Sequence, residues 1–115
     1  MSGITSHVLD TSRGAPAAGI SVILEINASD SGEENWTKVG GGTTNSDGRV
    51  PDLTKEPIRA GHYRINFQVA SYFAAQQTES FYPVVRIEFA VEDSQQHYHV
   101  PLLLNPFGYS TYRGS

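Results

Sequence analysis

The chain has 115 residues, enough for one domain with a single core, and its 38% hydrophobic and 17% charged residues exclude a disordered protein. Its net charge is −4 and its 8 Lys and Arg residues form no run, which argues against nucleic acid as a partner. It has no cysteine, which excludes disulfides, thiolate metal sites and a thiol nucleophile.

The N-terminal residues indicate where in the cell the protein is expected. Residues 1–10 carry neither the basic nor the apolar segment of a signal peptide, and a strand pattern begins at Ile4. No apolar run approaches the roughly 20 residues that a membrane span requires. We therefore expect one soluble domain over residues 1–115, located in the cytoplasm and without a membrane partner.

Alternation of apolar and polar residues recurs along most of the chain and is typical of strands. It predicts strands over residues 4–9, 20–27, 36–43, 62–69, 84–91 and 97–104, with a shorter candidate over 50–53. Turn signals separate them, notably residues 14–16 and 45–48, and residues 28–35 form a polar loop. One segment, residues 71–78, looks helical, with Ser71 as its N-cap. Seven to eight strands and one short helix predict an all-β fold, an antiparallel two-sheet β-sandwich.

The faces of these strands that should meet water are unusually apolar. Such a surface usually marks an interface, so we expect a second subunit against this sheet and a cleft between subunits that the histidines line. The residues of this expected outer face are Thr5, His7, Leu9, Ile23, His99, Pro101 and Leu103.

Histidine can act as an acid, a base or a metal ligand near neutral pH. Of the four in this chain, His62 and His97 are best interpreted as structural, whereas His7 and His99 share their sheet faces with apolar residues. His97 and His99 also form an H-x-H pair that could hold zinc, but a third ligand would have to be His7 or a carboxylate, and no carboxylate has a convincing spacing.

The last residues, 109–115, carry aromatic rings, an arginine and hydroxyls where chain ends usually fray, and we interpret them as part of a site. Ser115 has no Gly-x-Ser-x-Gly elbow around it, so it is expected to orient water or substrate rather than to attack. Arg49 follows an Asp-Gly turn; it is either a solvated charge or a planar fork that suits an anion or an amide.

Three segments together resemble the transthyretin-related 5-hydroxyisourate hydrolases of purine catabolism. They are Ser-His-Val-Leu-Asp at residues 6–10 with Gly-Ala-Pro-Ala at 14–17, Thr-Asn-Ser-Asp-Gly-Arg at 44–49, and residues 97–115, which end in Tyr-Arg-Gly-Ser. The resemblance covers essentially the whole chain. Two departures are Asn105, where serine is expected before Pro106, and a long stretch over residues 28–42.

The resemblance implies a transthyretin-like fold and hydrolysis of 5-hydroxyisourate to 2-oxo-4-hydroxy-4-carboxy-5-ureidoimidazoline, with no metal and no organic cofactor. It implies a homotetramer, a dimer of dimers with its sites in the channel between the dimers. Which histidine is the general base stays open, as does whether Ser115 acts through its hydroxyl or its carboxylate. The implied catalytic residues are His7, Arg49, His99 and Ser115, and the implied substrate-binding residues are His7, Arg49, Tyr112, Arg113 and Gly114.

Three other hypotheses compete with the hydrolase. The first is a transthyretin-like binding protein without catalysis, the second a structural β-sandwich module, and the third a zinc amidohydrolase. Eukaryotic relatives can be peroxisomal, but Ser115 ends no Ser-Lys-Leu signal, so the cytoplasm remains the expected location.

Overall fold

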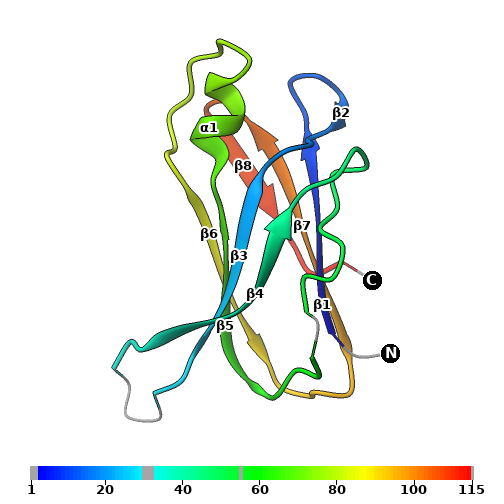
Figure 1. The fold of residues 1–115 in the computed structure, drawn as a ribbon, viewed down its shortest axis with the longest axis vertical. Coiled ribbons are helices and arrows are strands. Elements are labelled where there is room, and N and C mark those ends of the chain that lie inside the picture. Colours follow the sequence, from blue (N-terminus) through cyan, green and yellow to red (C-terminus); the bar gives the residue numbers. More distant parts are fainter. Residues whose placement is uncertain (1–2, 30–32, 55, 115) are drawn as a thin grey trace.

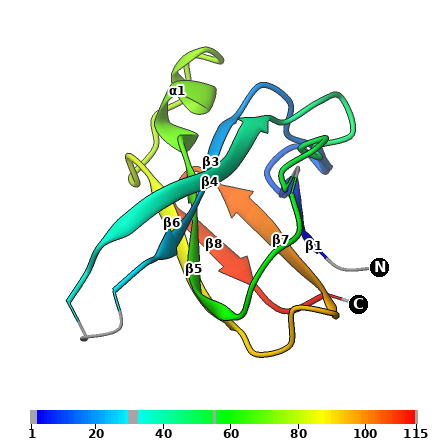
Figure 2. The same ribbon diagram turned by 60° about the horizontal axis from the view of Figure 1, so that its bottom comes forward.

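The computed structural model describes residues 3–29, 33–54 and 56–114 and forms two stacked four-stranded sheets. One sheet has the strand order β2-β1-β7-β8 and the other the order β4-β3-β5-β6, as Figures 1 and 2 show from two directions. The predicted two-sheet sandwich with one short helix is thus confirmed. The elements are β1 (Gly3–Asp10), β2 (Ala15–Pro16), β3 (Ser21–Asn27), β4 (Trp36–Thr43), β5 (Gly61–Phe67), α1 (Val69–Ala74), β6 (Val85–Val91), β7 (His97–Asn105) and β8 (Gly108–Thr111).

The core lies between the two sheets, because alternate side chains of each strand point inward. In β1 every second residue, from Ile4 to Asp10, is buried, and β3 alternates in the same way. Each large apolar side chain buried in this layer stabilises the fold by about 1.5–3 kcal/mol. The largest side chains that are almost fully buried include Tyr63, Phe67, Phe73, Ile4, Leu24 and Leu102.

One strand pair departs from the antiparallel expectation. β1 and β7 run parallel, in register from Gly3 beside His97 to Asp10 beside Leu104, whereas all the other strand pairs of the described residues are antiparallel. These two strands lie at opposite ends of the chain, so no hairpin turn dictates their direction. The register places Thr5 beside His99 and His7 beside Pro101, with all four residues on the outer face of the sheet.

The helix begins earlier than predicted. α1 spans Val69–Ala74 instead of residues 71–78, and Ser71 lies inside it, donating a hydrogen bond to the Gln68 carbonyl at 3.2 Å rather than capping it. Tertiary contacts explain the shift, because Val69, Tyr72 and Phe73 are all buried. Within the described residues, no helix has both the length and the apolar character that a membrane crossing requires.

A buried carboxylate joins this helix to the end of β1. The Tyr72 hydroxyl donates to Asp10 at 2.7 Å, and Ser12 donates through both its backbone N–H and its hydroxyl. Burial alone would raise the pKa of the Asp10 carboxyl, but the hydrogen bonds from Ser12 and Tyr72 outweigh burial and lower it. Asp10 therefore stays ionised and links β1 to α1.

Three short segments differ from the sequence prediction. Residues 50–53 form a turn rather than a strand, because Val50 and Leu53 both insert their side chains into the core. Conversely, Ala15–Pro16 and Gly108–Thr111, which carried turn signals or lay near the chain end, pair with β1 and β7 as β2 and β8. These pairings extend the sheet that carries His7, His97 and His99.

Candidate active site

The outer face of β1 and β7 collects most of the residues that the sequence predicted to share a surface. The exception is Ile23, which lies on β3 in the other sheet, so its grouping with this face was wrong. Pro101 is buried, while the remaining members of the face are half-buried. They are Thr5, His7 and Leu9 from β1 with His99 and Leu103 from β7.

A tight turn carries Arg49 to this face. The Gly48 N–H donates to the Asn45 carbonyl at 2.9 Å, and the Asn45 side-chain oxygen accepts from the N–H groups of Asp47 and Arg49. Gly48 adopts a φ of 76°, a left-handed conformation that favours glycine. Its carbonyl accepts from the Val8 N–H at 2.8 Å, and an antiparallel backbone bridge then pairs Arg49 with His7.

A second bridge carries the last described residues to the other histidine. The Gly114 N–H donates to the His99 carbonyl at 2.8 Å, and the two residues form an antiparallel bridge beyond the end of β8. Tyr112, just before this bridge, is 58% exposed. Ser115, predicted to be catalytic, lies outside the described residues.

His7 and His99 each have a glycine packed against the imidazole ring. A Cβ atom added to Gly114 would lie 2.6 Å from Cδ2 of His99. A Cβ atom added to Gly48 would lie 3.3 Å from Cδ2 of His7 and only 2.4 Å from the Val8 carbonyl oxygen. The two glycines therefore allow the backbone to approach the imidazoles closely and limit the ring positions.

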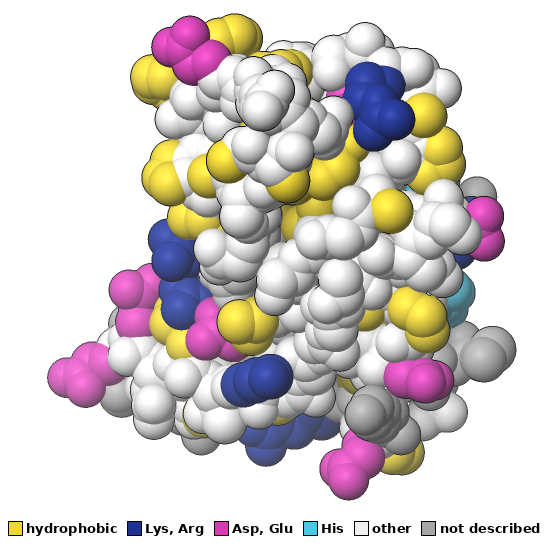
Figure 3. All heavy atoms as spheres, turned by 45° about the horizontal axis from the view of Figure 1, so that its top comes forward, with side chains coloured by type: hydrophobic (Ala, Val, Ile, Leu, Met, Phe, Trp, Pro, Cys, Tyr) yellow, Lys and Arg dark blue, Asp and Glu magenta, His cyan; other side chains and the backbone are white. Residues whose placement is uncertain are grey.

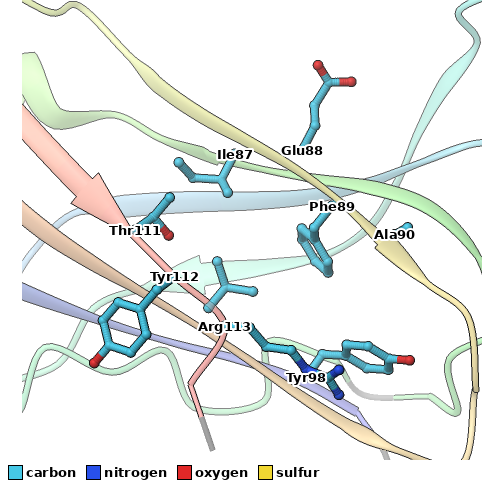
Figure 4. A pocket seen from close by; sticks show the side chains of 9 residues that line it. Ile87, Glu88, Phe89, Ala90, Tyr98, Thr111, Tyr112 and Arg113 are labelled. Carbon is cyan, nitrogen blue, oxygen red and sulfur yellow. The ribbon is translucent and has the colours of Figure 1, made fainter.

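Arg113 lies apart from this cluster. Its guanidinium carbon lies 4.3 Å from the centre of the Tyr98 ring, and its Nη2 donates to Gln96 at 2.9 Å. Tyr98 points inward from β7, on the opposite side of the strand from His99. Figure 4 shows Arg113 beside Tyr98 at a pocket. This pocket has a volume of about 250 Å³, and β6, β7, the end of β8 and the segment after it line it. The structure thus brings together His7, Arg49, His99 and Gly114 but directs the Arg113 side chain elsewhere.

The surroundings of His99 favour its neutral form. Burial is the main cause that lowers the pKa of the His99 imidazole below its ordinary value. The positive charge of Arg49 lowers that pKa further, as do His97 and His7. A neutral imidazole at physiological pH can accept a proton from water.

The other two histidines have identifiable neighbours. His97 is exposed, and its Nε2 lies 2.8 Å from the Thr5 hydroxyl. His62 lies on β5 in the other sheet, 3.3 Å from a Glu88 oxygen and edge-on to Trp36. Among the described residues, no three His, Asp or Glu side chains come together in a group that could hold a metal ion.

Two residues of this region were not singled out as functional from the sequence. Thr5 contacts both His97 and His99, a contact that depends on the register of two strands distant in the chain. Asn45 organises the turn before Arg49, and the Asn-x-Asp-Gly pattern was a usable signal for it.

Comparison with known proteins gives consistent matches over nearly the whole chain. The family model described as "HIUase/Transthyretin family" matches residues 4–114. A 5-hydroxyisourate hydrolase of Halalkalibacterium halodurans is 47% identical over 122 residues, covering 100% of both chains. The structure of Klebsiella pneumoniae 5-hydroxyisourate hydrolase is 36% identical with a TM-score of 0.81, covering 100% of this chain and 94% of that one. Transthyretin from Sparus aurata is 28% identical with a TM-score of 0.90, covering 99% and 97%.

Proposed function

The chain belongs to the HIUase/Transthyretin family, and from that premise we propose that it hydrolyses 5-hydroxyisourate at the cluster of His7, Arg49 and His99. The relatives named as 5-hydroxyisourate hydrolases are 41% to 47% identical to this chain over 97% to 100% of its length, and they support the activity. The observation that carries the proposal is the pair of backbone bridges, His7 to Arg49 and His99 to Gly114. They bring three distant segments to one sheet face.

The reaction is hydrolysis of the cyclic N1–C6 amide. The oxygen of water attacks C6, the C6–N1 bond breaks, and the product is 2-oxo-4-hydroxy-4-carboxy-5-ureidoimidazoline. One proton of the water ends on N1, and the other is released when the new carboxyl group ionises. The protein must therefore accept a proton from water, stabilise the oxyanion on C6 and return a proton to N1.

His99 is the proposed general base. Its half-buried, neutral imidazole accepts the proton of the attacking water and then returns it to N1, a role that typically contributes about 100- to 10,000-fold. Arg49 is the proposed partner of the oxyanion, because its permanent positive charge acts electrostatically on the same imidazole. Gly114 borders the site through its bridge to His99, and His7 completes it on the β1 side. Tyr112 stays a proposed substrate-binding residue, because it lies two positions before Gly114 with its ring exposed.

The proposed assembly is a homotetramer, a dimer of dimers with its sites in the channel between the dimers. Two features support it. Leu9 and Leu103 flank the histidines on a sheet face that stays only half covered in one chain. Large aromatic side chains also stay exposed near that sheet, among them Phe107 and Tyr109.

The test of the activity is the ultraviolet decay of freshly generated 5-hydroxyisourate with the native protein and with His99→Ala. The native protein should accelerate the decay, and the variant should be slower by at least about 100-fold with the assembly intact. His62→Ala is the matched control, since His62 lies on the other sheet, and it should retain native turnover.

Each outcome decides one part of the proposal. Near-native turnover by His99→Ala would remove this histidine as the base. No acceleration by the native protein would exclude the hydrolase and favour a transthyretin-like binder.

Because the pKa of His99 is lowered, kcat/KM should keep its plateau to a pH below the ordinary histidine value of about 6.5 before falling on the acid side.

A further inference from the structure

The Thr5 hydroxyl lies between the two histidines of β7. Its oxygen is 2.8 Å from Nε2 of His97 and 2.7 Å from Nδ1 of His99, so both contacts have hydrogen-bond length. The parallel register creates this arrangement, because Thr5 is directly beside His99 and Gly3 is directly beside His97. A side chain at position 5 can therefore reach both rings.

The number of protons restricts how these three groups can bond. A hydroxyl has one proton, and a neutral imidazole carries one proton on only one of its two nitrogens. Thr5 can therefore donate to one ring and must accept from the other. In one arrangement, His99 donates from Nδ1 to Thr5, and Thr5 donates to Nε2 of His97. In the reverse arrangement, Nδ1 of His99 accepts, which leaves its proton on Nε2.

Only the first arrangement leaves Nε2 of His99 free to accept a proton. Among residues 3–29, 33–54 and 56–114, the groups that face His99 are Thr5 and His7 on β1, Arg49 from the turn, His97 on its own strand and the backbone of Gly114. None of them is an acid that would stabilise a lasting charge on His99, and Arg49 opposes one. His97 is exposed to solvent, where a positive charge is less costly.

We propose that Thr5 is a positioning residue that holds His99 in the Nδ1–H tautomer, and that the chain His99–Thr5–His97 carries the released proton from the site to solvent. This inference rests on the proposed hydrolase function. When Nε2 of His99 takes a proton from the product carboxyl group, Nδ1 gives its proton to Thr5, and Thr5 gives its own to Nε2 of His97. His99 is then neutral, His97 carries the charge, and loss of that proton to water followed by the reverse tautomer shift restores the starting state.

The kinetic test compares Thr5→Val with Thr5→Ser. Valine keeps the branched shape of threonine but has no hydroxyl, whereas serine keeps the hydroxyl. Thr5→Val should lower kcat by at least about tenfold with little change in KM, and Thr5→Ser should restore most of it. His97→Ala should also slow turnover, and added imidazole should restore it, whereas imidazole should not affect His62→Ala.

A second measurement needs no substrate. In protein labelled with 15N at histidine, the imidazole NMR spectrum reports which ring nitrogen carries the proton. Native protein and Thr5→Ser should show His99 protonated on Nδ1, and Thr5→Val should show a shift toward Nε2–H. This readout separates the inference from the activity, because an inactive native protein would refute the hydrolase while the spectrum would still report the tautomer.

Two results would overturn the inference. One is a native spectrum with the His99 proton on Nε2. The other is a folded Thr5→Val protein with native kcat at every pH and an unchanged His99 tautomer. Thermal unfolding of each variant shows whether it is folded, and the native imidazole spectrum decides the tautomer in the case in which the valine variant is not.

Discussion

At the scale of single residues, two glycines limit where the two imidazoles can lie. Gly114 needs no left-handed conformation, so its importance comes from the space that its missing Cβ leaves beside the His99 ring. Gly48 needs both the left-handed conformation and the absence of a Cβ atom. Its φ is 76°, and a Cβ atom would lie 2.4 Å from the Val8 carbonyl oxygen. A methyl group at either position would test a different property of the site.

Gly114→Ala should reduce turnover without reducing stability. Its Cβ would lie 2.6 Å from Cδ2 of His99, so the ring must move, and a displacement of about 1 Å can cost on the order of 100-fold in rate. The free energy of unfolding should change by less than about 0.5 kcal/mol, because Gly114 is only half-buried and lies outside the hydrophobic core. Turnover of 5-hydroxyisourate and thermal unfolding measure the two effects.

The matched control is Gly108→Ala. Gly108 lies in β8, and a Cβ atom there would lie 3.7 Å from the nearest atoms, the Asn105 amide group, which is an ordinary contact. This variant should keep native turnover. Equal turnover of the Gly114 and Gly108 variants would mean that the His99 ring is not held by the backbone of the last described residues.

The sequence identified residues of distinctive chemistry, but not their connections. His7 and His99 stood out because each shares its sheet face with apolar residues. Arg49 was left open as a solvated charge or a fork for an anion or an amide, and only the family resemblance implied a catalytic role for it. Thr5 could not be identified in the same way, since its contact with both histidines depends on a parallel register between strands at opposite ends of the chain. The Arg113 side chain lies against the Tyr98 ring. That contact likewise depends on a tertiary feature, the path of the last residues along β7.

At the scale of elements, the turn over residues 45–48 supports Arg49 through one side chain. The Asn45 side-chain oxygen accepts from the Asp47 N–H at 2.9 Å and from the Arg49 N–H at 3.1 Å. The residue before it, Thr44, is fixed to Ile20 by backbone and side-chain hydrogen bonds. The turn is therefore held at its start by the bonds to Ile20, just before β3, and at its end by the bridge between Arg49 and His7.

Asn45→Ala should release this turn and lower activity. Loss of its two accepted hydrogen bonds should lower the free energy of unfolding by about 1–2 kcal/mol and turnover by about tenfold, since Arg49 loses its fixed position. Asn27→Ala is the control, because the Asn27 side chain accepts two similar bonds, from the Ser29 N–H at 3.1 Å and the Asn35 N–H at 3.2 Å, but supports no site residue.

Chemical denaturation and the decay of 5-hydroxyisourate measure the two effects separately. Both variants should lose stability, but only Asn45→Ala should lose activity. If the two asparagine variants lose activity equally, the effect reflects general loosening of the sheet rather than the position of Arg49.

Local pattern predicted most of the long elements and missed those that tertiary contacts decide. The alternation in β3, β5, β6 and β7 is long enough to identify each strand on its own. Residues 50–53 were predicted as a short strand, but they form a turn from which Val50 and Leu53 pack their side chains into the core. The start of α1 depends on burial of Val69 and Tyr72, which local helix propensity does not encode.

At the scale of the whole molecule, exposed aromatic residues gather at the end that carries α1. The Phe81 N–H donates to the Pro106 carbonyl at 2.8 Å, so the segment after α1 packs on the turn between β7 and β8. Figure 3, in which this end is tilted toward the viewer, shows hydrophobic side chains among uncharged ones, with a few acidic and basic side chains between them. Phe81 is 69% exposed and Phe107 is 63% exposed.

Three of the aromatic residues at this end, Phe81, Tyr82 and Tyr109, are in contact with one another. Tyr82 packs edge-on against both Phe81 and Tyr109, so aromatic residues from two segments form a continuous cluster. Large contiguous apolar surface on a small domain usually contacts another chain. In the proposed tetramer this cluster would lie at a subunit interface beside the sheet face that carries His7 and His99.

Phe107→Asp should therefore break the assembly and reduce activity together. The native protein should sediment as four chains of 12.5 kDa each, whereas a buried unpaired carboxylate at this interface should shift the variant to smaller species. Val39→Asp is the matched control, since Val39 is 47% exposed on β4 in the other sheet, and it should remain tetrameric and active. Sedimentation velocity and turnover at the same protein concentration test the coupling. A Phe107→Asp protein of smaller size with native turnover would place the whole reaction within one chain and contradict a site that needs the channel between dimers.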